Sequence, residues 1–456
     1  SMEMILEFLR DVLSQPALLI GIMSCVGLIA LKRPFHKIMT GTLKPILGYL
    51  MLAAGAGVIV SNLDPLGKMI EHGFHITGVV PNNEAIVAVA QKVLGVETMS
   101  ILVVGLLMNL LIARFTKFKY VFLTGHHSLF MACLMSAVLG TAGLSGIELI
   151  LVGGFLMGAW SAISPAIGQS YTSKVTDGDE IALGHFGSLG YYLSAWVAKY
   201  VGKAEESTED IEIPEKWGFL RDSTLSTALT MIVFYLIAAI AAGSEFVSTL
   251  SGSMSPYLFA VMSAMNFAVG VAIVYSGVRM ILGDLIPAFQ GIATKIIPNA
   301  IPAVDCAVFF TYAPTAVVLG FISSFIGGII GMLILGAVGG VLIIPGLVPH
   351  FFCGATAGIY GNATGGRRGA AVGAFLNGLA ITFLPALALP VLGQLGFQNT
   401  TFGDADFAVM GLVLGNAFEW IGMAGIYGVV VIAALVLIIP NFIKTKGKVI
   451  NYVEEE

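Results

Sequence analysis

Long apolar runs separated by short polar segments make up most of the chain. A membrane-spanning helix needs about 20 predominantly apolar residues, because it must cross the hydrocarbon core of the bilayer. Windows of that kind occur at residues 16–31, 43–62, 97–114, 120–140, 145–166, 223–243, 255–276, 305–325, 327–346, 369–394 and 410–440. The pattern predicts an all-α polytopic membrane protein with about eleven transmembrane helices.

Three stretches, residues 65–93, 164–201 and 345–369, are too polar or too rich in glycine and proline to be simple spans. The last of them, PGLVPHFFCGATAGIYGNATGGRRG, is expected to be too broken for a single helix. Irregular backbone at membrane depth is tolerated only where protein or a water-filled cavity surrounds it. We therefore expect an internal cavity and at least one re-entrant hairpin.

Basic residues cluster in one set of loops, which indicates the cytoplasmic side of the membrane. With an odd number of spans, the C-terminus lies inside and the N-terminus outside. The longest polar segment, Gly202–Asp222, would face the cytoplasm, and a solvated connection is the simpler interpretation of it. The clustered basic residues are Lys32, Arg33, Lys37, Arg114, Lys117, Lys119, those between Lys199 and Arg221, Arg367, Arg368 and those between Lys444 and Lys448.

Composition agrees with a membrane protein: 57% of the 456 residues are hydrophobic and 11% are charged, and the mean hydropathy is +0.93. The net charge of -5 and the scattered basic residues exclude nucleic acid as a partner. The four cysteines lie in apolar or glycine-rich segments without metal-binding spacing, so we expect buried thiols and neither disulfides nor a metal site. No phosphate-binding loop is present, and no cofactor is expected.

One carboxylate, Asp305, lies within the apolar segment IPAVDCAVFFTYAP. Placing a carboxylate at membrane depth costs several kcal/mol, so such a residue is interpreted first as a substrate, ion or proton site. The alternative is that Asp305 caps the helix that follows it. Both can hold, because transporter sites are often built at the ends of broken helices.

Histidines in apolar surroundings are further candidates for a polar site. His126 and His127 lie in FLTGHHSLF, and His185 lies in LGHFGSLGYY. Their rings can donate hydrogen bonds to hydroxyl groups in a cavity or accept them. The alternative is a histidine whose hydrogen bonds are satisfied in the core or in a turn.

Three short matches in the same order predict a weak inverted internal repeat, with halves of approximately 16–201 and 223–440. In such transporters the binding site lies between the halves, where equivalent residues face each other. The matched pairs, in chain order, are KPILGYL at 44–50 with RMILGDL at 279–285, Glu97 with Asp305, and His126 with His350.

Several segments together resemble one known family: LTGHHSLF, KVTDGDEIALGHFGS, GKAEESTEDIEIP, IPAVDCAVFFTYAP and LIIPGLVPHFF. They are similar to the ascorbate-specific membrane component, IIC, of the bacterial phosphoenolpyruvate-dependent phosphotransferase system. The resemblance covers essentially the whole chain and implies a single IIC transporter domain over residues 1–456. It also implies a homodimer in the bacterial inner (cytoplasmic) membrane, with an interface domain and a mobile core domain that carries substrate between the two membrane faces.

The resemblance further implies a function. The sugar, ascorbate or a related sugar acid or polyol, binds from outside and is carried inward. A phosphocysteine on a separate cytoplasmic IIB subunit, recharged through a IIA subunit, then phosphorylates it. The phosphoryl donor would lie on that partner and not in this chain, so no catalytic residue is assigned here.

Carried over by position, the resemblance places substrate contacts at Ala56, Asn83, Glu84, His126, Phe130, His185, Phe186 and Asp305. The histidines and Asp305 match the family's residue types. In place of its small hydroxyl or amide side chains this chain has Ala56, Phe130 and Phe186, and an Asn83-Glu84 pair replaces a Thr-Tyr pair. Each lost amide removes a hydrogen bond worth about 1 kcal/mol, whereas the aromatic rings can stack on a sugar face.

A different class of function remains open from the residues alone. In an ion-coupled secondary transporter, Asp305 and Glu97 would titrate to drive uptake. Transport into vesicles without phosphotransferase proteins, with and without a proton or sodium gradient, separates the two classes.

Overall fold

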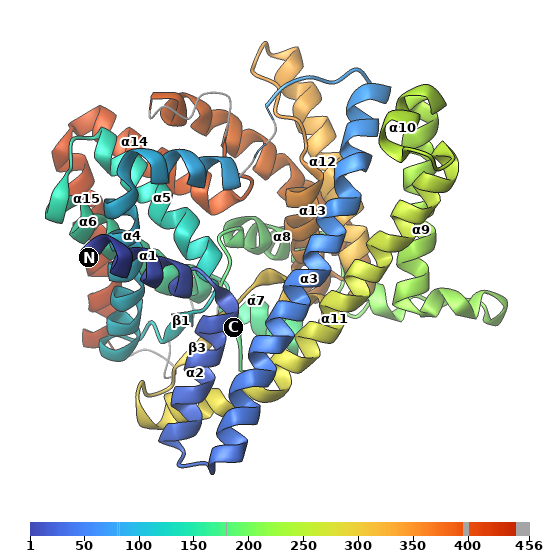
Figure 1. The fold of residues 1–456 in the computed structure, drawn as a ribbon. Helices are drawn as coiled ribbons and strands as arrows, with labels where there is room; N and C mark the ends of the chain where they lie inside the picture. Colours follow the sequence, from blue (N-terminus) through green and yellow to red (C-terminus); the bar gives the residue numbers. More distant parts are fainter. Residues whose placement is uncertain (80, 82, 179, 395–400, 444–456) are drawn as a thin grey trace.

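The computed structural model describes residues 1–79, 81, 83–178, 180–394 and 401–443, and it is mostly helical (Figure 1). Within these residues, eight helices are long and apolar enough to cross a membrane. The count becomes nine if α1 (Met2–Leu13) and α2 (Pro16–Ala30), which meet at 82°, form one bent span. The chain is therefore a polytopic membrane protein.

The difference from about eleven predicted spans has identifiable causes. Residues 305–346 contain one long helix, α12 (Pro314–Ala337), where two spans were predicted, because the apolar run continues across its glycines without a break. The predicted span at 120–140 is a strand followed by α5 (Gly125–Thr141), which has only 17 residues. The predicted span at 410–440 is two helices, α14 (Ala405–Ile421) and α15 (Met423–Ile438), separated by Gly422 at a φ of 72°.

Two long helices form the spine of one side of the molecule (Figure 1). They are α3 (Phe35–Gly73) and α11 (Pro256–Lys295), and they pack along each other together with α2, α9 (Ser223–Ala242) and α10 (Ser244–Ser251). Glycines allow the close contact, since a Cβ on Gly48 would lie 2.9 Å from the Gly277 carbonyl oxygen. The segments 44–50 and 279–285 of the predicted repeat therefore meet in space, while the repeat itself remains a prediction.

The other side of the molecule has its own buried core (Figure 1). Aromatic and aliphatic side chains of several helices fill it, and α1 packs against α4 at its edge. The helices that form this side are α4 (Asn83–Phe115), α5, α6 (Gly146–Ile167), α14 and α15.

The glycine-rich stretch 345–369, expected to be too broken for one helix, is helical as far as Gly365. It begins α13 (Leu347–Gln394), whose one non-helical residue is Gly366, with φ 63°. Its glycines serve close packing: a Cβ on Gly358 would lie 2.6 Å from the Ala316 carbonyl oxygen of α12. The predicted break is therefore confirmed at Gly366, where two helices meet at a kink, while packing against α12 and α8 (Ser188–Val201) accompanies a regular helix before it.

A small parallel sheet, which the all-α prediction missed, joins segments far apart in the sequence. Its strands are β1 (Tyr120–Phe122), β2 (Ala182–Leu183) and β3 (Ile301–Val304), in the order β1-β3-β2. Phe122 pairs with Ala303, and Leu183 pairs with Val304. Strands of two to four residues escape prediction from pattern because they are too short to show a period.

The long polar loop after α8 is mostly exposed, as expected for a solvated connection, and it also contacts the start of α12. It contains two 3-10 helices, Thr208–Asp210 and Glu215–Arg221. The short helix α7 (Gln169–Thr176) is not part of this loop and lies before β2 in the chain. The Glu209 carboxylate accepts hydrogen bonds from the first two amides available at the start of α12, those of Thr315 and Ala316, at 2.8 and 3.2 Å. Acidic side chains stabilise helix N-termini in this way.

Candidate functional site

The candidate site lies at the carboxyl ends of the three parallel strands. His126 and His127 follow β1, His185 follows β2 and Asp305 follows β3. Parallel strands end at the same edge of a sheet, so residues almost 180 positions apart come together there. The glycine before His185 serves this arrangement, because a Cβ on Gly184 would lie 2.4 Å from the Ala303 carbonyl oxygen of β3.

Asp305 caps the turn that follows it, which confirms one of its two interpretations. Its Oδ1 accepts a hydrogen bond from the Cys306 amide at 2.7 Å, at the start of the 3-10 helix Cys306–Tyr312. Its Oδ2 accepts a hydrogen bond from the Tyr49 hydroxyl of α3 at 2.8 Å. A carboxylate offers about four acceptor positions, so Asp305 keeps capacity for further donors.

Two histidines face Asp305 at distances too long for direct hydrogen bonds. His126 Nε2 lies 3.7 Å from Oδ2 of Asp305, and His185 Nε2 lies 3.9 Å from Oδ1. Side-chain exposure is 37% for His126 and 5% for His185. Because N–H···O hydrogen bonds rarely exceed about 3.2 Å, neither pair bonds directly, but an oxygen atom placed to one side of either pair can lie at hydrogen-bond distance from both of its atoms.

Backbone amides set the protonation of two of the rings. The Phe186 amide donates to Nδ1 of His127 at 3.1 Å, and the Gly187 amide donates to Nδ1 of His185 at 3.2 Å. A ring nitrogen that accepts a hydrogen bond carries a lone pair, so each neutral ring holds its proton on Nε2. His127 and His185 therefore present fixed N–H donors.

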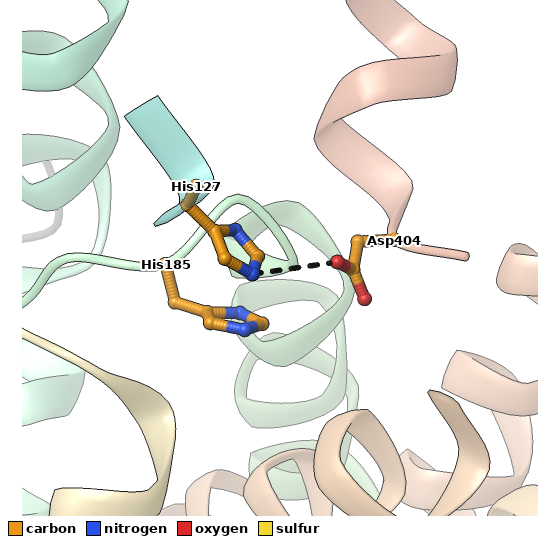
Figure 2. A group of neighbouring side chains, drawn as sticks. All are labelled: His127, His185 and Asp404. Atoms are coloured by element: carbon orange, nitrogen blue, oxygen red, sulfur yellow. Dashed lines mark ion pairs between the residues drawn. The ribbon is translucent and has the colours of Figure 1, made fainter. Parts of the chain in front are cut away.

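A second carboxylate, Asp404, lies beside these histidines (Figure 2). Its Oδ2 is 3.7 Å from His127 Nε2, and the rings of His127 and His185 lie 3.9 Å apart. The Cys353 thiol donates to Oδ1 of Asp404 at 2.8 Å, and Asn83 Nδ2 donates to Oδ2 at 3.2 Å. His185 thus neighbours both carboxylates.

Phe130 and Asn83, two of the substrate contacts that the resemblance predicts, lie beside the cluster. The Phe130 ring meets the His126 ring edge-on, with centroids 5.9 Å apart. Asn83 contacts Asp404 and also accepts a hydrogen bond from the Gly403 amide at 2.9 Å.

The remaining residues that the resemblance assigns to the site are Phe186, Ala56 and Glu84. Phe186 is fully buried and stacks on Phe122, with centroids 4.6 Å apart, while its ring also lies 6.0 Å from that of His127. Ala56 is half-buried on α3, two helical turns beyond Tyr49 and on the same face. The side chain of Glu84 lies outside the described part of the chain.

The residues of the predicted repeat do not occupy like positions. Glu97 lies half-buried within α4, whereas Asp305 follows a strand. His350, paired in the sequence with His126, is fully buried in α13 and its Nδ1 lies 2.9 Å from the Ser324 hydroxyl.

Sequence reasoning missed Tyr49, Asp404 and Cys353. Asp404 lies in the apolar segment TFGDADF, so the argument that singled out Asp305 applied to it as well. Cys353 was expected to be only a buried thiol, and the structure adds a hydrogen bond to Asp404. Tyr49 carries no signal in the sequence, because it lies 256 positions from the residue that it contacts.

Proximity alone would allow a metal at two groups, His127 with His185 and Asp404, and His185 with Asp305 and Cys306. A histidine binds a metal through an unprotonated ring nitrogen. In His127 and His185 the lone pair of Nδ1 is engaged by a backbone amide, and Nε2 carries the proton. These donor sets therefore do not fit a metal ion. They fit a molecule rich in hydroxyl groups, because each hydroxyl can accept from an N–H and donate to a carboxylate.

Comparison with known proteins agrees with a site for a molecule rich in hydroxyl groups. A family described as "PTS system sugar-specific permease component" matches residues 11–406. A relative from Mycoplasma pneumoniae (strain ATCC 29342 / M129 / Subtype 1), named "Ascorbate-specific PTS system EIIC component", is 26% identical over 417 residues. The alignment covers 78% of this chain and 62% of the relative, so the chain spans somewhat less than two thirds of that protein's length.

The family match extends over most of the chain and includes every strand end that builds the candidate site. The eight apolar helices found in the described part of the chain agree with this match. The chain belongs to the family of sugar-specific permease components, IIC, of the phosphotransferase system.

Proposed function

We propose that this chain binds ascorbate or a related sugar acid or polyol at Asp305 and carries it inward for phosphorylation. The observation that supports this most directly is the meeting of His126, His185 and Asp305 at one edge of the sheet. A substrate hydroxyl in either gap accepts from a histidine and donates to Asp305. Sugars carry several such groups, which suits a site with more than one gap.

The phosphoryl group comes from outside this chain in our proposal. A cytoplasmic IIB subunit carries it on a phosphocysteine, and a IIA subunit recharges that cysteine. Phosphoryl transfer depends mostly on positioning and charge stabilisation. Asp305 holds the sugar by its hydroxyl groups and orients the hydroxyl that attacks the phosphorus.

The same proposal includes the assembly. The protein forms a homodimer in the bacterial inner membrane, and in each copy a core domain moves against an interface domain. The site supports such a motion, because its residues come from different helix groups. His126 lies at the start of α5, in the helix group of α4 and α6, whereas the Tyr49 hydroxyl that donates to Asp305 belongs to α3, in the helix group of α11. Movement of the core past α3 would break and remake this hydrogen bond.

The test is Asp305→Asn, which keeps an oxygen to accept from the Cys306 amide and so preserves the cap. We expect the variant to lose at least 100-fold in substrate affinity by isothermal calorimetry in detergent, while it elutes as the wild type does in gel filtration. The matched control is Asp64→Asn, the same change at an exposed residue paired with Lys68.

Uptake into vesicles then tests the mechanism. Wild-type protein should accumulate sugar phosphate only when IIA, IIB and phosphoenolpyruvate are supplied. Uptake driven by a proton or sodium gradient in their absence would contradict the proposal and favour an ion-coupled transporter that uses Asp305 and Glu97. An unchanged affinity in Asp305→Asn would remove Asp305 from the site.

A further inference from the structure

We propose that Asn109 is a positioning residue of the candidate site. Its side-chain amide takes the place of one residue of a fourth parallel strand beside β1, and so fixes the strand that carries His126 and His127. The inference rests on the proposed function, because it concerns how the substrate-binding histidines are held. It starts from a single amide in the apolar segment ILVVGLLMNLLIA of residues 101–113, where a polar side chain needs a partner.

The outer edge of β1 has no strand beside it among the described residues. The sheet has the order β1-β3-β2, and on its inner side β1 meets β3, where the Leu123 amide donates to the Ala303 carbonyl oxygen at 2.9 Å. Successive residues of a strand direct their backbone groups to opposite sides, so Tyr120 and Phe122 direct theirs away from β3. Such groups are costly to leave unpaired at membrane depth, where no water replaces the missing partner.

Asn109 of α4 supplies the partners that this edge lacks. Its Nδ2 donates to the Tyr120 carbonyl oxygen at 3.0 Å, and its Oδ1 accepts from the Phe122 amide at 2.9 Å. A residue of a parallel strand makes the same pair of bonds, to the carbonyl of one residue and to the amide two positions later. Asn109 is fully buried, so water does not compete for either bond. One side chain therefore completes the sheet at this point.

Close helix packing fixes the position of Asn109 itself. A Cβ on Gly158 of α6 would lie 2.9 Å from the Gly105 carbonyl oxygen and 3.0 Å from the Asn109 backbone nitrogen of α4. Glycine permits such an approach, which brings the two helices into contact at the level of Asn109. The amide is thus presented to β1 by a rigid pair of helices on a short side chain.

The strand that Asn109 holds leads directly into the site. His126 lies four positions after Phe122, and His127 follows it. The Nε2 atoms of the two histidines each lie 3.7 Å from a carboxylate oxygen, that of Asp305 for His126 and that of Asp404 for His127. Neither carboxylate belongs to β1, so a shift of this strand would change both distances together. Hydrogen bonds weaken quickly as their geometry departs from the optimum, so substrate affinity should depend on the position of β1.

The outer edge of β2 is completed in a similar but weaker way. Gln169 of α7 donates from Nε2 to the Ile181 carbonyl oxygen at 3.1 Å, while its Oε1 makes no hydrogen bond with the described residues. Side-chain amides therefore lie at both outer edges of the sheet. Of the two, Asn109 uses both its donor and its acceptor on one strand, so we expect the larger effect on binding from Asn109.

The experiment measures L-ascorbate binding by isothermal calorimetry in detergent. If the wild type binds another sugar acid or an alditol more tightly, that compound is the probe. Asn109→Leu has a similar volume but bonds to neither backbone group, and it should raise the Kd about tenfold with an unchanged number of binding sites. The matched control is Asn62→Leu, because Asn62 donates to the Val58 carbonyl oxygen of its own helix at 2.8 Å. The control should keep the wild-type Kd.

The Kd and the number of sites together separate positioning from stability. A residue that only stabilises the fold would lower the unfolding temperature or the number of sites and leave the Kd of folded protein unchanged, and this result in Asn109→Leu would overturn the inference. A second variant, Asn109→Gln, keeps the amide but places it one methylene farther from α4. It should raise the Kd about threefold while the protein stays folded, because β1 is displaced and not released. If Asn109→Leu does not fold, a wild-type Kd in Asn109→Gln is the result that overturns the inference.

The proposed function fails in a different way. Binding that is lost in Asp305→Asn but unchanged in both Asn109 variants would overturn only the present inference. Binding that survives Asp305→Asn and weakens in Asn109→Leu would remove Asp305 from the site and leave the role of Asn109 in place. No saturable binding of any probe by the wild type would overturn the proposed function and this inference with it.

Discussion

Asp404 and Asp406 are two residues apart and both buried, yet they lie in different chemical states. Asp406 is fully buried and accepts from three donors: the Ser188 hydroxyl at 2.6 Å, the Leu189 amide at 3.0 Å and the Trp160 indole at 3.2 Å. Asp404 accepts from two donors and leaves a gap of 3.7 Å to a histidine N–H. Burial of a carboxylate is therefore no sign of function by itself; unfilled acceptor capacity beside oriented donors is the better sign.

The position of Asp406 explains its closed state. Ser188 and Leu189 begin α8, so the carboxylate lies at a helix N-terminus, where unsatisfied amides favour negative charge. Trp160 adds a donor from α6. Asp406 thereby fastens α14 to α6 and α8, and the rigid attachment of α14 holds Asp404 beside His127.

The largest effect should come from removing the carboxylate of Asp406, whose hydrogen bonds to three buried donors make it the closed carboxylate of the comparison. Asp406→Ala removes the shared acceptor of three buried donors and should lower the free energy of unfolding by about 3 kcal/mol. Thermal unfolding in detergent measures this, with Asp64→Ala as the exposed control. Folded variant should still bind substrate. An unfolding temperature equal to that of the wild type would show that Asp406 does not fasten these helices.

The next effect concerns Asp305, which like Asp404 is an open carboxylate, with acceptor positions that its two donors leave unfilled. Tyr49→Phe removes the hydroxyl that positions Asp305 and should weaken substrate binding about tenfold, which corresponds to about 1.4 kcal/mol. Tyr275→Phe is the matched control, because the hydroxyl of this buried tyrosine makes no hydrogen bond with the described residues. Calorimetry should show the loss in Tyr49→Phe alone. Equal affinities in the two variants would separate Tyr49 from the site.

The smallest effect should come from removing one of the three donors to Asp406, the Ser188 hydroxyl. Ser188→Ala should lower the free energy of unfolding by about 1 kcal/mol and leave substrate affinity unchanged. Ser128→Ala is its control, since the buried Ser128 hydroxyl makes no hydrogen bond with the described residues. If Ser188→Ala instead weakened binding as Tyr49→Phe is expected to, the distinction between open and closed carboxylates would be wrong.

Part of this site could be predicted from local chemistry. Asp305 stands out because a carboxylate in an apolar segment needs a reason. The same reasoning reaches Asp404 and Asp406 but cannot separate them, because the donors that close Asp406 come from α6 and α8, more than 200 positions away. For glycine the local reading was incomplete: α13 does break at Gly366, but its other glycines allow helices to approach closely, which the pattern did not predict.

The sequence by itself determined that this protein lies in a membrane and which family it belongs to, and it singled out Asp305 and the histidines as candidates for the polar site. Apolar length, charged-residue placement and short motifs are local properties, so the chain displays them directly. Only the tertiary structure decided which polar groups meet, because three short strands, paired across 181 and 121 positions, bring their ends to one edge. It also decided which carboxylates remain open, since hydrogen-bond satisfaction depends on donors supplied by distant helices.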